Sequence, residues 1–166
     1  MKNHTEIDNF DFLQALLEGN RCECSRIVHS HLKNKIIVHD LYEKVIRKSL
    51  YEVGKLWERN QISVATEHLA SAIVEALLND MTVDNNDKGV GKVIVSCVEN
   101  EHHQIGIKMV SDIFELNGWS SFFLGANTPT NELMSFTQYI KPDLLAISLT
   151  IYSNISILEK MIRKIN

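Results

Sequence analysis

The chain lacks the features of a secreted or membrane-spanning protein. It has only three cysteines, and their odd number and irregular spacing fit reduced thiols in a cytoplasmic protein better than a disulfide framework. No apolar run approaches the roughly 20 residues that a transmembrane helix needs. The start, Met1–His4, does not resemble a signal peptide. We therefore expect a cytoplasmic protein that makes no contact with a membrane.

The chain also lacks a strong excess of positive charge and an evident catalytic group. The formal net charge is −4, and the basic residues are scattered rather than clustered. This excludes an extended nucleic-acid surface, which would need a basic patch. The sequence contains no nucleophile–base pair and no glycine-rich phosphate loop, so we do not expect it to be an enzyme on its own.

What the chain does contain is enough apolar material for one medium or two small domains, since 45% of its 166 residues are hydrophobic. Residues 9–81 have apolar side chains at helical spacing and predict a small four-helix bundle. Residues 82–91 are polar, carry turn residues and predict a linker. Residues 92–166 alternate between strand and helix patterns and predict parallel strands with crossover helices.

Within the bundle, the first predicted helix ends at Gly19-Asn20 and the second runs from Cys22 to about Leu32. Apolar residues at helical spacing predict the third helix, at Ile46, Leu50, Val53 and Trp57, and the fourth, at Leu69, Ile73, Ala76 and Leu77. Ser63 is the predicted cap of the fourth helix.

The second half predicts strands near 92–98, 120–124 and 144–149 and helices near 105–116, 130–140 and 154 to the end, with Thr130 as a helix cap. A flavodoxin-like sheet usually has about five strands. We therefore expect a flavodoxin-like parallel sheet that is truncated after its third strand.

The most informative segment is Glu101–Gly106, which joins the first predicted strand to the following helix. In open α/β sheets, ligands bind at such strand-to-helix loops. An imidazole at His103 can ligate a transition metal, and the carboxylate of Glu101 can hold its other ring nitrogen. Gly106 would let a bulky ligand approach the backbone. Taken alone, three defined positions are few, and the isolated motif is better explained as a solvated polar loop.

The wider context resembles the cobalamin-binding domain, whose signature is D-x-H-x-x-G after the first strand and Ser-x-Leu or Thr after a later one. Glu101 stands where the family has Asp, and Ser148-Leu149-Thr150 matches the second motif. The resemblance implies that His103 is the lower axial ligand of cobalt. It also implies that the hydroxyls of Ser148 and Thr150 face the nucleotide tail of the cofactor.

A second group belongs to the helical half. Trp57 near the end of the third helix and Glu67-His68 near the start of the fourth would meet at one end of a helical hairpin. Trp57 offers a flat face for a macrocycle or its upper substituent, and Glu67 and His68 offer hydrogen bonds. Individually, each has a plainer explanation: a tryptophan that fills the bundle, and a glutamate favoured by the helix dipole.

Together these residues resemble the cap bundle of cobalamin-dependent light-sensing regulators, which carry Trp, nine residues, then Glu-His over an adenosyl group. The chain departs from those regulators in two ways. Only about nine residues precede the first helix, so we expect no winged-helix DNA-binding domain and no direct contact with nucleic acid. Glu58 stands where some members have a histidine that ligates cobalt after illumination, so this position cannot supply such a ligand.

Three functions remain open, in this order. The first is a cobalamin sensor that holds adenosylcobalamin between the bundle and the α/β domain and signals through a protein partner or a missing output domain, with homo-oligomers possible. The second is a corrinoid carrier of a methyltransferase system, for which methylcobalamin is the alternative cofactor. The third is an α/β response domain without cobalamin, in which His103 is structural.

Overall fold

The computed structural model describes residues 9–32, 35–81 and 89–165. The chain divides into two compact units, Met1–Thr82 and Val83–Asn166. Most of the linker predicted at 82–91 lies outside the described residues.

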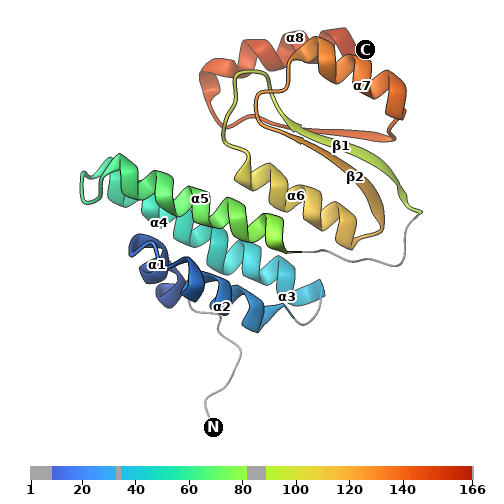
Figure 1. Cartoon of the computed structure of the whole chain (residues 1–166). Coiled ribbons are helices and arrows are strands. Elements are labelled where there is room, and N and C mark those ends of the chain that lie inside the picture. The colour runs from blue at the N-terminus through green and yellow to red at the C-terminus, as the bar shows by residue number, and fades with distance from the viewer. Residues whose placement is uncertain (1–8, 33–34, 82–88, 166) are drawn as a thin grey trace. The chain divides into compact units, whose positions relative to one another are not determined.

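The first unit is helical (Figure 1). Its elements are α1 (Phe10–Leu17), α2 (Arg21–His31), α3 (Lys35–Asp40), the π-helical segment η1 (Leu41–Ile46), α4 (Arg47–Glu58) and α5 (Val64–Asp80). Because α3, η1 and α4 follow one another without a gap, they make one long third helix. This helix starts earlier than the Ile46–Trp57 repeat indicates, because the wider π turn interrupts the spacing of its apolar residues.

Local signals explain the helix boundaries of this unit. The side chain of Asn20 caps α2 by accepting the N–H of Glu23 at 3.1 Å. The predicted cap of α5 is confirmed, since Ser63 Oγ accepts the N–H of Thr66 at 3.1 Å. Gly19 follows α1 with φ of +69°, and a Cβ there would lie 2.8 Å from Leu69 Cδ2. The left-handed backbone conformation therefore favours glycine, while the Leu69 side chain, which is flexible and exposed, could move aside.

The core of the unit is formed by buried apolar side chains from each of its long helices. They include Phe12, Leu16, Val28, Leu41, Val45, Ile46, Val53, Val74, Leu77 and Leu78.

The second unit is a three-stranded parallel sheet with helices on both faces (Figure 1). Its elements are β1 (Gly91–Cys97), α6 (Ile105–Leu116), β2 (Trp119–Gly125), α7 (Thr130–Ile140), β3 (Leu144–Ser148), the short 3₁₀ helix η2 (Tyr152–Asn154) and α8 (Ile155–Ile165). The strand order is β2-β1-β3, and both pairings are parallel. The predicted fold class of a helical region followed by a flavodoxin-like parallel sheet is confirmed.

Side chains of the central strand β1 alternate between two cores. Val93, Val95 and Cys97 pack with Ile107 of α6. Ile94 packs on the other face, with Leu133 of α7 and Met161 of α8. Since both faces of β1 are covered, its residues are almost uniformly apolar, which is why the strand is readable in the sequence.

One predicted cap is wrong. Thr130 is the first residue of α7 and not its cap, and the preceding residue is Pro129, which offers no side-chain hydrogen bond. The carboxylate of Glu99 caps α7 instead. Its Oε2 accepts hydrogen bonds from the backbone N–H of Thr130 at 3.2 Å and from the Thr130 hydroxyl at 2.7 Å.

This topology places the carboxyl ends of β1 and β3 side by side, with Cys97 opposite Ser148. The chain leaves β1 towards α6 on one face of the sheet and leaves β3 towards α8 on the other (Figure 1). Connections that diverge in this way open a crevice between the two loops, and ligands of open α/β sheets bind in such crevices. Across the described residues, no helix combines the length and the apolar character needed to cross a bilayer.

Candidate functional site

The loop after β1, residues 98–104, is held in place by the loop after β2. Asn127 Oδ1 accepts the N–H of Asn100 at 2.9 Å, and the N–H of Asn127 donates to the carbonyl of Glu101 at 2.9 Å. The side chain of Gln104 accepts the N–H of Ala126 at 3.1 Å. The backbone that carries Glu101 and His103 is therefore fixed by several hydrogen bonds of its own unit.

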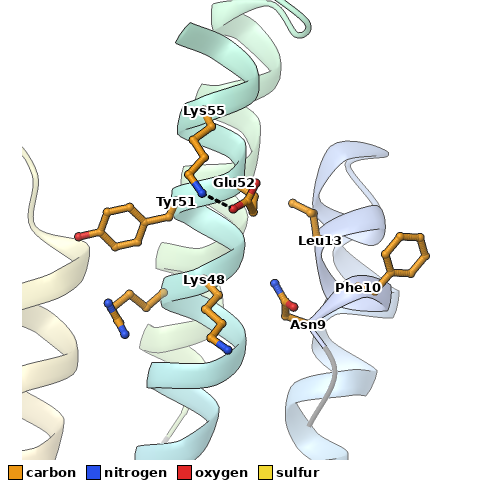
Figure 2. Close-up of a pocket in the computed structure, with 8 residues that line it drawn as sticks. Asn9, Phe10, Leu13, Lys48, Tyr51, Glu52 and Lys55 are labelled. Carbon is orange, nitrogen blue, oxygen red and sulfur yellow. Dashed lines mark hydrogen bonds and ion pairs between the residues drawn. The ribbon is translucent and has the colours of Figure 1, made fainter. Parts of the chain in front are cut away.

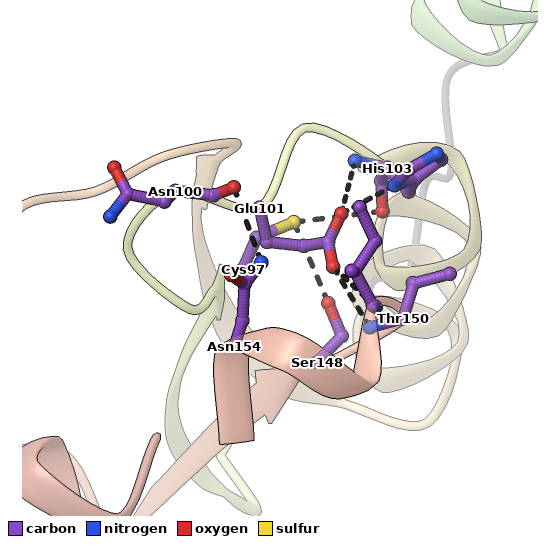
Figure 3. Close-up of polar contacts among 8 residues, drawn as sticks. Cys97, Asn100, Glu101, His103, Ser148, Thr150 and Asn154 are labelled. Atoms are coloured by element: carbon purple, nitrogen blue, oxygen red, sulfur yellow. Dashed lines mark hydrogen bonds and ion pairs between the residues drawn. The ribbon is translucent and has the colours of Figure 1, made fainter. Parts of the chain in front are cut away.

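Glu101 is the centre of the site (Figure 3). Its side chain is fully buried, with an exposed fraction of 0%. One carboxylate oxygen accepts the N–H of Thr150 at 3.0 Å and the N–H of Ile151 at 2.9 Å. The other accepts the backbone N–H of His103 at 3.1 Å and also contacts Nδ1 of the His103 ring. A single carboxylate thus joins the loop after β1 to the loop after β3.

These hydrogen bonds decide the charge of Glu101. Burial raises the pKa of a carboxyl group, but the bonds from the His103 ring and from the N–H groups of Ile151, His103 and Thr150 outweigh it. The pKa of Glu101 falls from 4.5 to about 2. The group is therefore ionised at neutral pH and can only accept hydrogen bonds.

The ionised carboxylate fixes the state of the His103 ring. Because Glu101 can only accept, Nδ1 of His103 must donate to it, and the lone pair of a neutral imidazole is then on Nε2. The His103 side chain is 59% exposed, and within the described part of the chain Nε2 makes no hydrogen bond. A carboxylate-oriented imidazole with a free Nε2 is the arrangement found in histidine metal ligands.

A metal ion that is already held in a macrocycle suits this site better than a bare metal ion. The described residues contain no group of three or more His, Cys, Asp or Glu side chains that could hold a metal. A single imidazole is enough for a metal whose other ligands come from a macrocycle. Gly106 supports this, because a Cβ built on it meets no atom within 4 Å. The folded chain itself leaves room there, and the space is open to a bulky ligand. The residues present fit the corrinoid cofactor that the sequence resemblance implies.

Ser148 and Thr150 both lie beside Glu101, but their hydroxyls are differently placed. Ser148 Oγ donates to Cys97 Sγ at 3.5 Å, and Cys97 Sγ also lies 3.7 Å from the carbonyl oxygen of His103 (Figure 3). Thr150 is exposed, and its backbone N–H is the group that binds Glu101. The structure thus brings Glu101, His103, Ser148 and Thr150 together.

Trp57, Glu67 and His68 belong to the first unit. Trp57 is 50% exposed, so it is not the interior tryptophan of the plainer explanation. Glu67 Oε2 lies 2.6 Å from Nδ1 of His68, and Glu67 Oε1 accepts the hydroxyl of Ser71 at 3.0 Å. The His68 side chain is 75% exposed. Glu67 therefore orients His68 through Nδ1, as Glu101 orients His103.

Two contributors could not be found from the sequence. Cys97 looked like an ordinary strand residue, yet its thiol contacts both Ser148 and the His103 carbonyl. Asn127 was not singled out in the sequence, yet it holds the loop of Asn100 and Glu101. The Asn127 contacts join residues more than 20 positions apart, and no local pattern encodes them.

Two family models match the chain, and both are described as a B12 binding domain. One covers residues 10–79 and the other covers residues 91–166. Together they span both units of the structure.

Curated relatives include regulators and corrinoid proteins. The chain is 29% identical over 89 residues to the HTH-type transcriptional repressor CarA of Myxococcus xanthus, a match that covers 53% of this chain and 31% of the repressor. It is 22% identical over 133 residues to dimethylamine corrinoid protein 2 of Methanosarcina acetivorans, covering 76% of this chain and 62% of that protein. The chain thus spans about a third to three fifths of these relatives. Neither name is that of an enzyme, in agreement with the expectation from the sequence.

A solved structure shares the fold. The monomethylamine corrinoid protein of Methanosarcina barkeri superimposes with a TM-score of 0.74 at 17% sequence identity, covering 93% of this chain and 75% of that one. At this identity the likeness concerns the fold alone.

Proposed function

Since the chain belongs to the family of B12 binding domains, we propose that it is a sensory or regulatory protein that uses adenosylcobalamin to detect light. The observation that best supports cobalamin binding is the contact between Glu101 and His103. The buried carboxylate of Glu101 binds Nδ1 of the exposed imidazole and leaves Nε2 free. When bound, the cofactor supplies a cobalt–carbon bond that light can break.

His103 would ligate the cobalt of the cofactor through Nε2, while Glu101 holds the ring by Nδ1. Gly106 keeps the backbone clear of the macrocycle. Ser148 and Thr150 line the crevice through which the nucleotide tail would enter. For Ser148 this requires the hydroxyl to exchange Cys97 for the cofactor or to accept a hydrogen bond while it donates to the thiol.

On the upper side, we assign the adenosyl group to the bundle residues Trp57, Glu67 and His68. The half-exposed ring of Trp57 offers an apolar face. The Glu67–His68 pair offers a polar edge already oriented by Ser71. Loss or photolysis of the cofactor would remove the group that Trp57, Glu67 and His68 would contact, and this change at the bundle would be the signal.

The output of such a sensor would lie outside the described residues, in a protein partner or a further domain, with assembly into homo-oligomers as one route. The repressor CarA supports a regulatory role, and the chain covers 31% of it. Transfer of its activity to this chain is part of the proposal.

A carrier role in methyl transfer is the second candidate, with methylcobalamin as cofactor. It is favoured by the extent of the matches, because dimethylamine corrinoid protein 2 matches 76% of this chain and CarA matches 53%. The exposed Trp57 and the Glu67–His68 pair favour the sensor.

The experiment that separates the candidates is an absorption spectrum of the purified chain with adenosylcobalamin, in the dark and after green light. A sensor binds adenosylcobalamin in the dark and changes spectrum and assembly state on illumination. Equal binding of methyl- and adenosylcobalamin, with no change of assembly state in light, would favour the carrier.

A further inference from the structure

A groove outside the crevice of Glu101 and His103 carries an unusual set of charges. It lies between the start of α7 and the length of α8 and has a volume of about 430 Å³. Its lining includes Glu99, Pro129, Thr130, Asn131, Ile157, Lys160, Arg163 and Lys164. None of these residues belongs to the cofactor site described above.

Three cations line one side of this groove. Lys160, Arg163 and Lys164 are spaced so that they share one face of α8, and all three are exposed. Within the described residues, neither Lys160 nor Arg163 makes a hydrogen bond or an ion pair. Lys164 Nζ donates to Asn131 Oδ1 at 3.1 Å, which is a neutral partner. The positive charges of α8 are therefore not neutralised by ion pairs.

The single carboxylate that lines the groove, that of Glu99, is engaged by hydrogen bonds at the start of α7. It binds the hydroxyl and the N–H of Thr130, and these two bonds, aided by the charge of Lys164, lower its pKa from the ordinary 4.5. It remains ionised and stays with the start of α7. The groove thus carries an excess of two positive charges over its one negative charge.

The groove between α1 and α4 provides the contrast (Figure 2). It has a volume of about 690 Å³ and is also lined by cations. There, however, Arg47 pairs with Glu43 at 2.7 Å and Lys55 pairs with Glu52 at 2.6 Å. Lys48 alone has no such partner within the described residues. Cations that form ion pairs with carboxylates offer little to an anion, whereas Lys160 and Arg163 form no ion pair within the described residues.

We propose that the groove between α7 and α8 binds the phosphate group of a small organic molecule. The guanidinium of Arg163 can bind two phosphate oxygens at once, while Lys160 and Lys164 act as point charges. Ile157 and Pro129 provide an apolar wall for the organic part, and the volume is that of a small-molecule site. The proposal is independent of cobalamin binding.

Titration with inorganic pyrophosphate at constant ionic strength tests this site, with amide resonances of 15N-labelled full-length chain as the readout. The expected result is saturable shifts at Asn131 and along α8, with the affinity reduced at least tenfold in the double variant Lys160→Gln/Arg163→Gln. Lys48→Gln removes one charge from the other groove and serves as the control, which should bind as the wild type does. The absence of saturable shifts in the wild type, equal affinity in the double variant, or an equal loss in Lys48→Gln would each overturn the proposal.

Phenyl phosphate and benzoate, compared in the same titration, test the phosphate chemistry. Phenyl phosphate should bind at least as tightly as inorganic phosphate and much more tightly than benzoate. Equal binding of the two aromatic anions would overturn the assignment to phosphate.

Discussion

The carboxylate of Glu101 accepts the backbone N–H of Ile151 at 2.9 Å, although the two residues are 50 positions apart in the chain. Through this bond, and the one from Thr150, the loop after β3 is tied to the residue that orients His103. A glutamate side chain reaches both the ring of His103 and the two N–H groups. The replacement of the family's aspartate by Glu101 therefore still leaves the carboxylate in contact with the histidine.

Glu101→Gln is predicted to make the protein less stable, by an amount that depends on pH. Because the pKa of Glu101 falls from 4.5 to about 2 on folding, the unfolded chain binds more protons between these values. The stabilisation is therefore complete above the unfolded pKa and is lost as the pH falls towards 2. At pH 7 the variant should lose roughly 3 kcal/mol of unfolding free energy. Urea unfolding from pH 7 to pH 3 should show the two proteins converging.

Glu159→Gln is the matched control for that series, since Glu159 is exposed on α8. It should follow the wild type at every pH. A gap between Glu101→Gln and wild type that stays constant down to pH 3 would contradict the assigned pKa.

Substitutions of Gly106 are predicted to separate folding from ligand binding. A Cβ at this position meets no atom within 4 Å, and the residue lies in the first turn of α6. Gly106→Ala should leave stability unchanged or raise it by up to about 1 kcal/mol. Gly106→Leu should also fold, but it should weaken cobalamin binding at least tenfold in calorimetric titration, because the side chain occupies the space of the cofactor.

Gly125→Ala is the contrasting variant. Its φ is +77°, and a Cβ would lie 2.9 Å from Gln104 Oε1, so it should lower stability by about 1 kcal/mol or more. Unimpaired cobalamin binding by Gly106→Leu would argue against the proposed approach of the macrocycle.

Ser49→Ala is predicted to stabilise the helical unit. The Ser49 side chain is fully buried, and its hydroxyl has no hydrogen-bond partner among the residues that the structure describes. Removing a buried donor without a partner should raise the free energy of unfolding by about 1 kcal/mol, as measured by urea unfolding. Ser71→Ala, which removes the 3.0 Å hydrogen bond to Glu67, should have no such benefit. A loss of stability in Ser49→Ala would mean that the hydroxyl makes a bond in solution.

Trp57→Ala is predicted to remove a preference for adenosylcobalamin over methylcobalamin while the protein stays folded. Its half-exposed ring is the apolar face assigned to the adenosyl group. Affinities of both cofactors, measured in the dark, provide the readout. Tyr51→Ala removes another exposed aromatic side chain from α4 and should keep the preference. Equal affinities in the wild type would instead support the carrier role.

The parts of the fold that follow from local patterns were predictable. The three strands and α6 through α8 lie within a few residues of their predicted ranges, because β1 is buried on both faces and the helices end at turn residues. The π-helical segment η1 was not, since its wider turn disrupts the apolar spacing.

The candidate site was also predictable only in the part that a local motif encodes. The motif identified Glu101, His103 and Gly106, and the structure brings the first two into contact. The links to Ile151, Asn127 and the thiol of Cys97 depend on tertiary contacts between separate loops. Thr130 illustrates the limit most clearly, because the capping carboxylate of Glu99 comes from a residue 31 positions away.

The most direct test of the central claim is the electron paramagnetic resonance spectrum of cob(II)alamin bound to chain that is labelled with 15N in its histidines. If Nε2 of His103 is the axial ligand, the nitrogen splitting of each cobalt line changes from a triplet in unlabelled protein to a doublet in labelled protein. His102→Ala should preserve the doublet, and His103→Ala should abolish it and weaken binding at least tenfold. A triplet that persists in labelled wild-type protein, or a doublet that survives in His103→Ala, would contradict the account.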